Sequence, residues 1–133
     1  MKLRKLSDAD KHIITPWYAI KGDNPVVDWL PIDTSFLVLE DDDDKPLACG
    51  SLLLTNGGMC FMEYIATNPY DKEFTQAKAL RFLAIELEKI AKSLGFKVIL
   101  GLVPEDHFSL VEFYKRQGAL LGTKLMRVTF KYI

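Results

Sequence analysis

Apolar and polar positions follow two rhythms along this chain, and each rhythm predicts a kind of secondary structure. In the first half, short apolar or alternating runs bounded by polar and turn-forming residues are typical of β-strands. Four segments show this pattern: Lys2–Ser7, Ser35–Glu40, Pro46–Thr55 and Met59–Thr67. The TNGG turn over Thr55–Gly58 predicts that the last two form a hairpin.

The second half begins with a helical rhythm. Apolar residues spaced three and four apart continue for about five turns, which predicts a long amphipathic helix. These residues are Ala77, Leu80, Leu83, Ala84, Leu87, Ile90, Ala91 and Leu94. Gly95 follows as a natural C-cap, and a second amphipathic helix is predicted over His107–Gly118. Near the N-terminus, a further helix is expected to open at Ser7 or Asp8 and to be bent or interrupted by Pro16.

Two more strands complete the predicted order. Lys97–Val103 is an apolar run typical of a strand covered on both faces, and Lys124–Ile133 alternates as a terminal strand. The predicted order is therefore β-α-β-β-β-α-β-α-β, an α/β (α+β) fold with a right-handed crossover in its second half. No repeat or linker divides the 133 residues, so a single domain over residues 1–133 is expected.

Composition excludes several classes of protein. The hydrophobic share of 49% and the charged share of 26% are those of an ordinary globular protein. A net charge of -1 gives no general attraction to nucleic acid or to anionic lipid. No apolar run approaches the ~20 residues that span a bilayer, and no apolar segment typical of a signal peptide follows the basic N-terminal residues. A cytoplasmic location without membrane or nucleic-acid partners is expected.

The cysteines and the acidic run predict neither a disulfide nor a metal site. Cys60 is expected opposite Leu53 and Cys49 near Tyr64, which separates the sulfurs by roughly 13 Å at ~3.3 Å per residue. A disulfide needs Cα atoms within ~7 Å, so two free, mostly buried thiols are predicted. The run DDDDK over Asp41–Lys45 lacks the ligand spacing of a calcium loop and is interpreted as a solvated turn.

The loop before the long helix carries the most informative pattern. In TNPYDKEFTQAKAL, a proline is followed by a basic residue and then by two small residues at the expected helix start. This resembles the coenzyme loop of the GNAT superfamily, the acyl-CoA-dependent N-acetyltransferases, although the glycines of that loop are missing. The residues at the motif positions are Pro69, Lys72, Thr75, Ala77 and Leu80.

Two further matches extend the resemblance over nearly the whole chain. EFYKRQGA is similar to the family's last helix, with Tyr114 before the helix-ending Gly118, and Glu63 stands where a carboxylate often occurs on the fourth strand. The likeness is greatest to small phage-encoded members. It implies a GNAT fold, with a central mixed sheet of about six to seven strands and helices on both faces.

The resemblance also implies which residues hold the coenzyme, acetyl-CoA. They are Ile65, Ala66, Thr67, Lys72, Glu73, Phe74, Thr75, Gln76, Ala77, Lys78 and His107. A helix start offers unpaired N–H groups and a partial positive charge, which suit a pyrophosphate. Thr75 brings a branched Cβ where the family has none. The alternative is an ordinary charged helix start, in which Asp71 and Glu73 neutralise the lysines.

Catalytic roles follow from the same resemblance. Glu63 is expected to act as a base toward the substrate ammonium, because desolvation in an apolar strand raises a carboxyl pKa. A carboxylate paired at the edge of a cleft is the equally weighted alternative. Tyr114 is expected to protonate the departing CoA thiolate, and its alternative is a tyrosine packed under the last helix. His107 stands near a position where the family often has a coenzyme contact, and its alternative is a helix cap or surface residue.

Two functions therefore remain open from the sequence. The first is an N-acetyltransferase that moves an acetyl group from acetyl-CoA to a primary amine by direct attack, as a monomer or homodimer. The second is a GNAT-shaped binding or interaction protein with weak or no catalysis, which the missing glycines favour. Trp17, Tyr18 and Trp29 fall in the region that shapes acceptor sites in the family, and the sequence leaves the acceptor itself undefined.

Overall fold

A computed structural model describes residues 1–22, 27–103, 107–120 and 122 of the chain. These residues belong to two compact units, Met1–Gly101 and Leu102–Ile133. The first unit contains the sheet and two of the α-helices. The second contains helix α3 over Phe108–Arg116, and the predicted terminal strand Lys124–Ile133 lies outside the described residues.

A mixed sheet of five strands forms the centre of the first unit, in the order β1-β2-β3-β4-β5. The strands are β1 (Lys2–Lys5), β2 (Ser35–Leu39), β3 (Pro46–Leu54), β4 (Met59–Thr67) and β5 (Val98–Leu100). The first four pair antiparallel, and β5 pairs parallel with the beginning of β4. The parallel pair is the result of a crossover through the long helix, as the strand–helix–strand pattern predicts.

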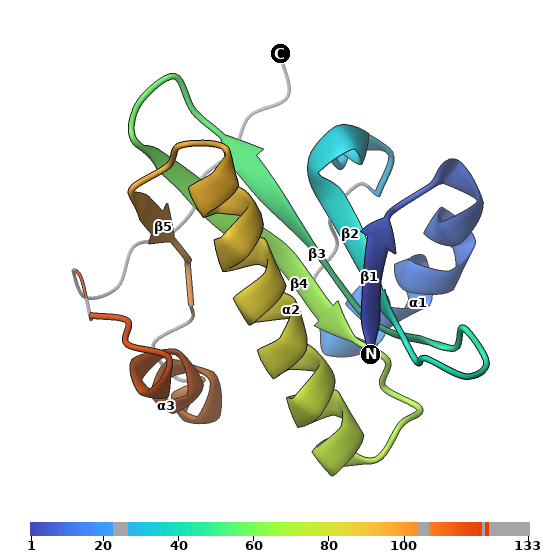
Figure 1. Ribbon diagram of the computed structural model, residues 1–133. Helices are drawn as coiled ribbons and strands as arrows, with labels where there is room; N and C mark the ends of the chain where they lie inside the picture. The colour runs from blue at the N-terminus through green and yellow to red at the C-terminus, as the bar shows by residue number, and fades with distance from the viewer. Residues whose placement is uncertain (23–26, 104–106, 121, 123–133) are drawn as a thin grey trace. The chain divides into compact units, whose positions relative to one another are not determined.

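Two helices cover opposite faces of this sheet. Helix α2 (Glu73–Ser93) crosses in front of the sheet in Figure 1, and α1 (Lys11–Lys21) lies behind it. On the α1 side, Trp17 packs into a buried cluster that includes Cys49 of β3. On the α2 side, Leu83 lies against Gly50, the next residue of β3. Successive side chains of a strand point to opposite faces, so the two helices enclose the sheet between them.

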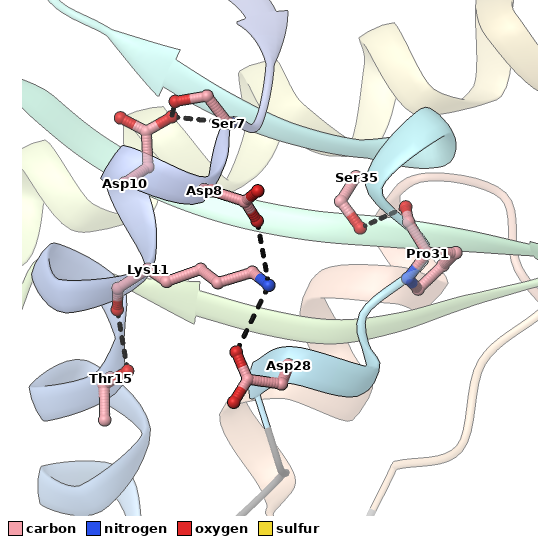
Figure 2. A network of polar contacts seen from close by, with 8 residues as sticks. All are labelled: Ser7, Asp8, Asp10, Lys11, Thr15, Asp28, Pro31 and Ser35. Carbon is pink, nitrogen blue, oxygen red and sulfur yellow. Dashed lines mark hydrogen bonds and ion pairs between the residues drawn. The ribbon is translucent and has the colours of Figure 1, made fainter.

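Polar contacts around α1 hold the N-terminal segment against the following loop. Three short 3-10 helices flank it: η1 (Asp8–Asp10), η2 (Val27–Trp29) and η3 (Ile32–Thr34). Figure 2 shows the Lys11 ammonium between the carboxylates of Asp8 and Asp28, at 3.0 Å and 3.2 Å, which links η1 to η2. Pro16 lies inside α1, which continues through it to Lys21 and ends at Gly22.

A bulge interrupts the ladder between β3 and β4. Cys49 pairs with Ala66 and Ser51 with Glu63, so two residues of β4 stand opposite Gly50 alone. Tyr64 adopts φ 55° at this point, a left-handed conformation that costs free energy for any residue with a Cβ. The bulge lies in the part of β4 that follows its ladder with β5, which ends at Phe61 in the described residues.

Most predicted elements are confirmed, and their limits differ by a few residues. The span of β4 is as predicted, while β1, β2, β3, β5 and α3 are shorter. Five strands lie in the described residues, where six to seven were expected. Along α2, Ala77 is exposed and Ala79 is fully buried, the reverse of the predicted face at that turn. Val98 and Leu100 are 48% and 37% exposed, so β5 is not covered on both faces as expected.

Both cysteines are free and buried, as predicted, although the register was misjudged. Cys60 stands opposite Leu54 instead of Leu53, because five residues separate this pair, one more than a four-residue turn would leave. Cys49 stands opposite Ala66, beyond the bulge. None of the helices in the described ranges has the length and apolar character that a bilayer crossing requires.

Candidate functional site

Among the described residues, no strand pairs with the outer edge of the last part of β4. The ladder with β5 runs from Met59–Val98 to Phe61–Leu100 in the described residues, whereas β4 continues to Thr67. The Asn68 amide donates to the Leu47 carbonyl on the β3 side. Because backbone groups alternate in direction along a strand, those of Thr67 and Ile65 face the other edge. Their binding of coenzyme through these backbone groups stays a prediction.

Two side chains of α1 contact the carbonyl groups at the bulge. The Tyr18 hydroxyl donates to the Tyr64 carbonyl, and the Lys21 ammonium donates to the Ile65 carbonyl at 2.8 Å. Tyr18 also lies 3.4 Å from the sulfur of Cys49. Burial raises the pKa of the Cys49 thiol to about 11, so this thiol is protonated at neutral pH and is a poor nucleophile.

A cavity of about 220 Å³ opens at the same edge. Its lining residues are Trp17, Ile20, Lys21, Ala66, Thr67, Pro69 and Gln76. They come from α1, from the end of β4 and from the start of α2, which cover different faces of the sheet. Neighbouring residues Ala66 and Thr67 also point to opposite faces. Because the cavity is lined by residues from both faces, it extends around the edge of β4. An extended ligand in the cavity would have access to the backbone of the strand.

The start of α2 adjoins this cavity. Lys72 is the N-cap residue, and its side chain makes no capping hydrogen bond. The first N–H groups of a helix have no partner within the helix, so this end offers donors and a partial positive charge to an anion. Lys72 and Lys78 are exposed, Thr75 is half-buried and Phe74 is 74% exposed.

The turn between β4 and α2 is held by side chains instead of glycines. The Gln76 amide accepts from the Thr67 hydroxyl at 2.8 Å and donates to the Asp71 carbonyl at 2.9 Å. The buried Asn68 accepts from the Tyr70 amide at 3.0 Å. Gln76, predicted to bind coenzyme, thus uses its side chain to join the strand end to the turn.

An ion pair ties this turn to the hairpin between β2 and β3. The Lys45 ammonium contacts one carboxylate oxygen of Asp71. The Asp71 side chain is only 10% exposed, and its second carboxylate oxygen is buried without a hydrogen-bond partner. The alternative interpretation of the sequence had Asp71 neutralising the lysines of the helix start. In the structure, Asp71 pairs with Lys45 of the hairpin instead.

The two predicted catalytic residues lie in different units. Glu63 is half-buried on β4, opposite Ser51 and directly before the bulge. Tyr114 is half-buried on α3, with its ring edge-on to Phe113 at 5.3 Å between centroids. His107 is the N-cap of α3, and its Nδ1 accepts from the Leu110 amide at 3.3 Å. That contact matches the capping alternative for His107.

The cavity brings together part of the predicted site and adds residues that sequence reasoning missed. Ala66, Thr67 and Gln76 line it, whereas Glu63 and Ala77 do not. Lys21 and Ile20 were not predicted. The available signal was their place in the last turn of α1, four and three residues after the predicted aromatic Trp17, which puts them on its face.

The fold is similar to that of solved acetyltransferases. A Mycobacterium tuberculosis protein crystallised in complex with CoA matches with a TM-score of 0.76 and 16% identity, over 95% of this chain and 76% of its own. A Trypanosoma brucei acetyltransferase matches with a TM-score of 0.72 and 17% identity, over 97% and 99% of the two chains. These likenesses support the expected α/β fold of the GNAT type.

The same fold also occurs under another description. A transcriptional regulator from Bacillus halodurans matches with a TM-score of 0.73 and 14% identity, over 97% of this chain and 99% of its own. No model of a known protein family and no curated protein sequence matches this chain. Because a fold hosts many activities, the activity has to be argued from the site.

Proposed function

We propose that this chain is an acyl-CoA-dependent N-acyltransferase of the GNAT superfamily, which moves an acetyl group from acetyl-CoA to a primary amine. The observation that carries the proposal is the cavity at the open edge of β4, next to the uncapped start of α2. A strand edge offers amide partners to a pantetheine arm, and a helix start offers donors to a pyrophosphate. The CoA-bound protein of similar fold supports the same ligand.

In this proposal the coenzyme lies along β4 and onto α2. The pantetheine amides pair with the backbone of Ile65 and Thr67, and the Lys21 ammonium leaves the Ile65 carbonyl when the arm arrives. The pyrophosphate contacts the N–H groups at the start of α2, between Lys72 and Ala77. The branched Cβ of Thr75 limits how closely the pyrophosphate can approach the backbone. The positive charge of the neighbouring lysines offsets this loss by attracting the pyrophosphate.

The chemistry needs no covalent enzyme intermediate. The amine nitrogen attacks the thioester carbonyl carbon, a C–N bond forms, and the C–S bond breaks as the tetrahedral intermediate collapses. Glu63, or a water that it orients, takes the amine proton, and Tyr114 gives a proton to the departing thiolate. These roles, His107 as a coenzyme contact and one domain over residues 1–133 all belong to the hypothesis, as do a cytoplasmic location and a phage-like origin.

A second function is favoured by one observation, the side-chain network that replaces the glycines of the loop. The side chains of Gln76 and Asn68 form hydrogen bonds within the turn, so these contacts hold the loop without a ligand. A protein of this fold that binds a partner or CoA without turnover would have such a loop. The Bacillus halodurans regulator illustrates that the fold is found under a description other than acetyltransferase.

Thermal unfolding with acetyl-CoA tests the binding step of the proposal. A ligand at 100 times its Kd adds ~2.7 kcal/mol to the free energy of unfolding, so micromolar binding raises the melting temperature measurably at millimolar ligand. ATP at equal concentration is the control for non-specific polyphosphate binding. No shift with acetyl-CoA would refute the proposal.

Turnover is tested separately, by CoA release across a panel of amines. Release is expected with at least one acceptor, and Tyr114→Phe is expected to lower the rate without changing the thermal shift. A shift without release in the panel would favour the binding protein. Thr75→Gly is expected to tighten acetyl-CoA binding, and weaker binding would contradict the loop assignment.

A further inference from the structure

The α1 side of the cavity at β4 combines a cation with an apolar wall. Among the described residues that line the cavity, Lys21 alone is charged, and Trp17 and Ile20 of the same helix lie beside it. The Lys21 ammonium donates to the Ile65 carbonyl at 2.8 Å, so the charge stands at the edge of the strand. Small-molecule sites commonly have such a lining, in which apolar surface gives contact and a few polar groups fix the orientation of the ligand.

The side chain of Glu63 projects from the same face of the sheet. Cys49 packs with Trp17 on the α1 face, and Ser51, two residues along β3, points to that face as well. Glu63 pairs with Ser51, and directly opposed residues of antiparallel strands share a face. Glu63 precedes Ile65 by two residues, roughly 7 Å at ~3.3 Å per residue. The α1 face therefore presents a carboxylate and an ammonium at about this spacing.

A free α-amino acid is complementary to this pair of charges. Its ammonium is attracted to a carboxylate and its own carboxylate to an ammonium, and a hydrogen bond of ~3 Å at each end allows it to bridge such a spacing. The cavity, of about 220 Å³, is smaller than the ~300–1,000 Å³ of sites for drug-sized ligands. Its size thus favours a small acceptor.

The contact between Lys21 and the Ile65 carbonyl also links this acceptor to the donor. An ammonium binds a carboxylate more strongly than it binds a neutral carbonyl. A carboxylate in the cavity would therefore draw the ammonium from the Ile65 carbonyl, which could then accept from a pantetheine amide. Such coupling is reciprocal, so the amino acid and CoA would each increase the affinity for the other.

We propose that the acceptor is a free α-amino acid, whose carboxylate binds Lys21 and whose carbon chain lies against Trp17 and Ile20. This inference rests on the proposed function and names the substrate class of the same site. The α-amine faces Glu63, and its nitrogen takes the acetyl group as the C–S bond of acetyl-CoA breaks. The ammonium loses two protons in all, of which one leaves through Glu63 and the other ends on the CoA thiol. The products are an N-acetyl amino acid and CoA.

Rates of CoA release with matched acceptors test the role of the carboxylate. The probes are the twenty common amino acids and, for each one that reacts, its amide and the amine that lacks the carboxyl group. At least one amino acid is expected to exceed its amide in kcat/KM by about tenfold or more, because a hydrogen bond to a charged group is stronger than one to a neutral group.

Variants of Lys21 test whether this side chain holds the carboxylate. At saturating acetyl-CoA, Lys21→Met is expected to lower kcat/KM for the amino acid about tenfold and to leave the amide unchanged. Lys21→Arg keeps the positive charge and is expected to keep most of the preference. Lys89→Met is the matched control, because Lys89 is an exposed lysine of α2 that pairs with Glu86. Unchanged melting temperatures will show that the variants fold.

Calorimetry gives a measurement that does not depend on turnover. CoA is titrated into the wild type with and without each amino acid at millimolar concentration. At least one amino acid is expected to tighten CoA binding about fivefold, and Lys21→Met is expected to lose this gain.

The outcomes separate this inference from the function on which it rests. If amides or plain amines react as well as the amino acids, or if no amino acid leads to CoA release, the inference is refuted, and the proposed function stands where another amine reacts. If Lys21→Met keeps the preference for the carboxylate, the inference is refuted as well. If the wild type does not bind acetyl-CoA, both proposals are refuted.

Discussion

Asp10 is a buried carboxylate that holds the N-terminal segment in place. The two guanidinium nitrogens of Arg4 donate to it at 2.6 Å and 2.8 Å, and the Ser7 amide and hydroxyl donate at 2.8 Å and 2.9 Å. These contacts, Arg4 first, lower the pKa of Asp10 from 3.8 to about 2. Opposite charge and hydrogen bonds both favour the ionised form.

The acid stability of the protein follows from this shift. The folded pKa lies below the unfolded one, so Asp10 stabilises the fold above pH ~4 and loses its contribution as the pH falls through about 2. Asp10→Asn is expected to cost about 2 kcal/mol of unfolding free energy at pH 7, and much less near pH 2. Urea unfolding across this range measures the effect. Asp8→Asn, at an exposed carboxylate, is the control, and equal losses in both variants would contradict the assignment.

Gly50 is required for the close approach of α2 to the sheet. A Cβ at this position would lie 2.5 Å from Ile65 Cδ1 and 3.1 Å from Leu83 Cδ2. Gly50→Ala is therefore expected to lower the unfolding free energy by ~1–3 kcal/mol, measured by urea denaturation. Gly58→Ala, where a Cβ would meet nothing within 4 Å, is the control. The packing argument fails if the two variants are equally stable.

At the scale of elements, the hairpin between β2 and β3 is coupled to the coenzyme turn through Lys45 and Asp71. Lys45→Met would leave the Asp71 carboxylate buried with neither oxygen paired to a cation. We expect faster amide hydrogen exchange over Asn68–Lys72, because the Asp71 carboxylate would lose the cation that holds the turn. Lys2→Met, which removes an exposed pair with Asp44 in the same hairpin, should leave that exchange unchanged. Unchanged exchange in both variants would refute the coupling.

Sequence periodicity identified the elements because burial imposes it directly. The alternation in β4 and the helical spacing in α2 reflect the faces that touch the core, so both elements were predicted nearly to their ends. The C-cap signal was equally local, since Gly95 adopts φ 90°, as the residue after a helix end commonly does. Such features depend on neighbours in the sequence alone.

Pairing across the sheet could not be predicted in the same way. The bulge places Tyr64 at φ 55°, a conformation that nothing about a tyrosine in an apolar strand suggests. It is stabilised by Tyr18, a residue of α1 that is distant in sequence. The register error at Cys60 and Cys49 follows from the same turn and bulge.

The candidate site was predicted in part for a related reason. The coenzyme turn is continuous in sequence, so Thr67, Gln76 and Ala66 were found. Lys21 reaches the cavity because the end of α1 lies beside the end of β4, where its ammonium donates to the Ile65 carbonyl. That placement is a property of the tertiary structure, and a single lysine at a helix end carries no signal of it.

At the scale of the whole molecule, the two thiols report on the unfolding of the first unit. Cys49 and Cys60 are 2% and 0% exposed, and burial raises the pKa of both thiols. A maleimide reagent at pH 7 is therefore expected to label both slowly and at one common rate, set by cooperative opening. Intact mass spectrometry measures the rate, and labelling in urea is the control. Labelling of one cysteine within seconds in the native protein would contradict this expectation.

An unpaired strand edge is also a template to which a second chain can add a strand. In the part of the chain that the structure describes, β4 beyond Phe61 presents such an edge, and the Lys21 ammonium donates to its Ile65 carbonyl. A charge at that point opposes pairing between two copies of the protein, and a ligand lying in the edge would oppose it as well. We expect the Lys21→Ala variant to self-associate more than the wild type at high concentration, and CoA to reverse this association. Light scattering measures the molar mass of both proteins. Equal molar masses would refute the expectation. The edge of β4 would then be a binding site when a ligand occupies it and a site of aggregation when it is unoccupied.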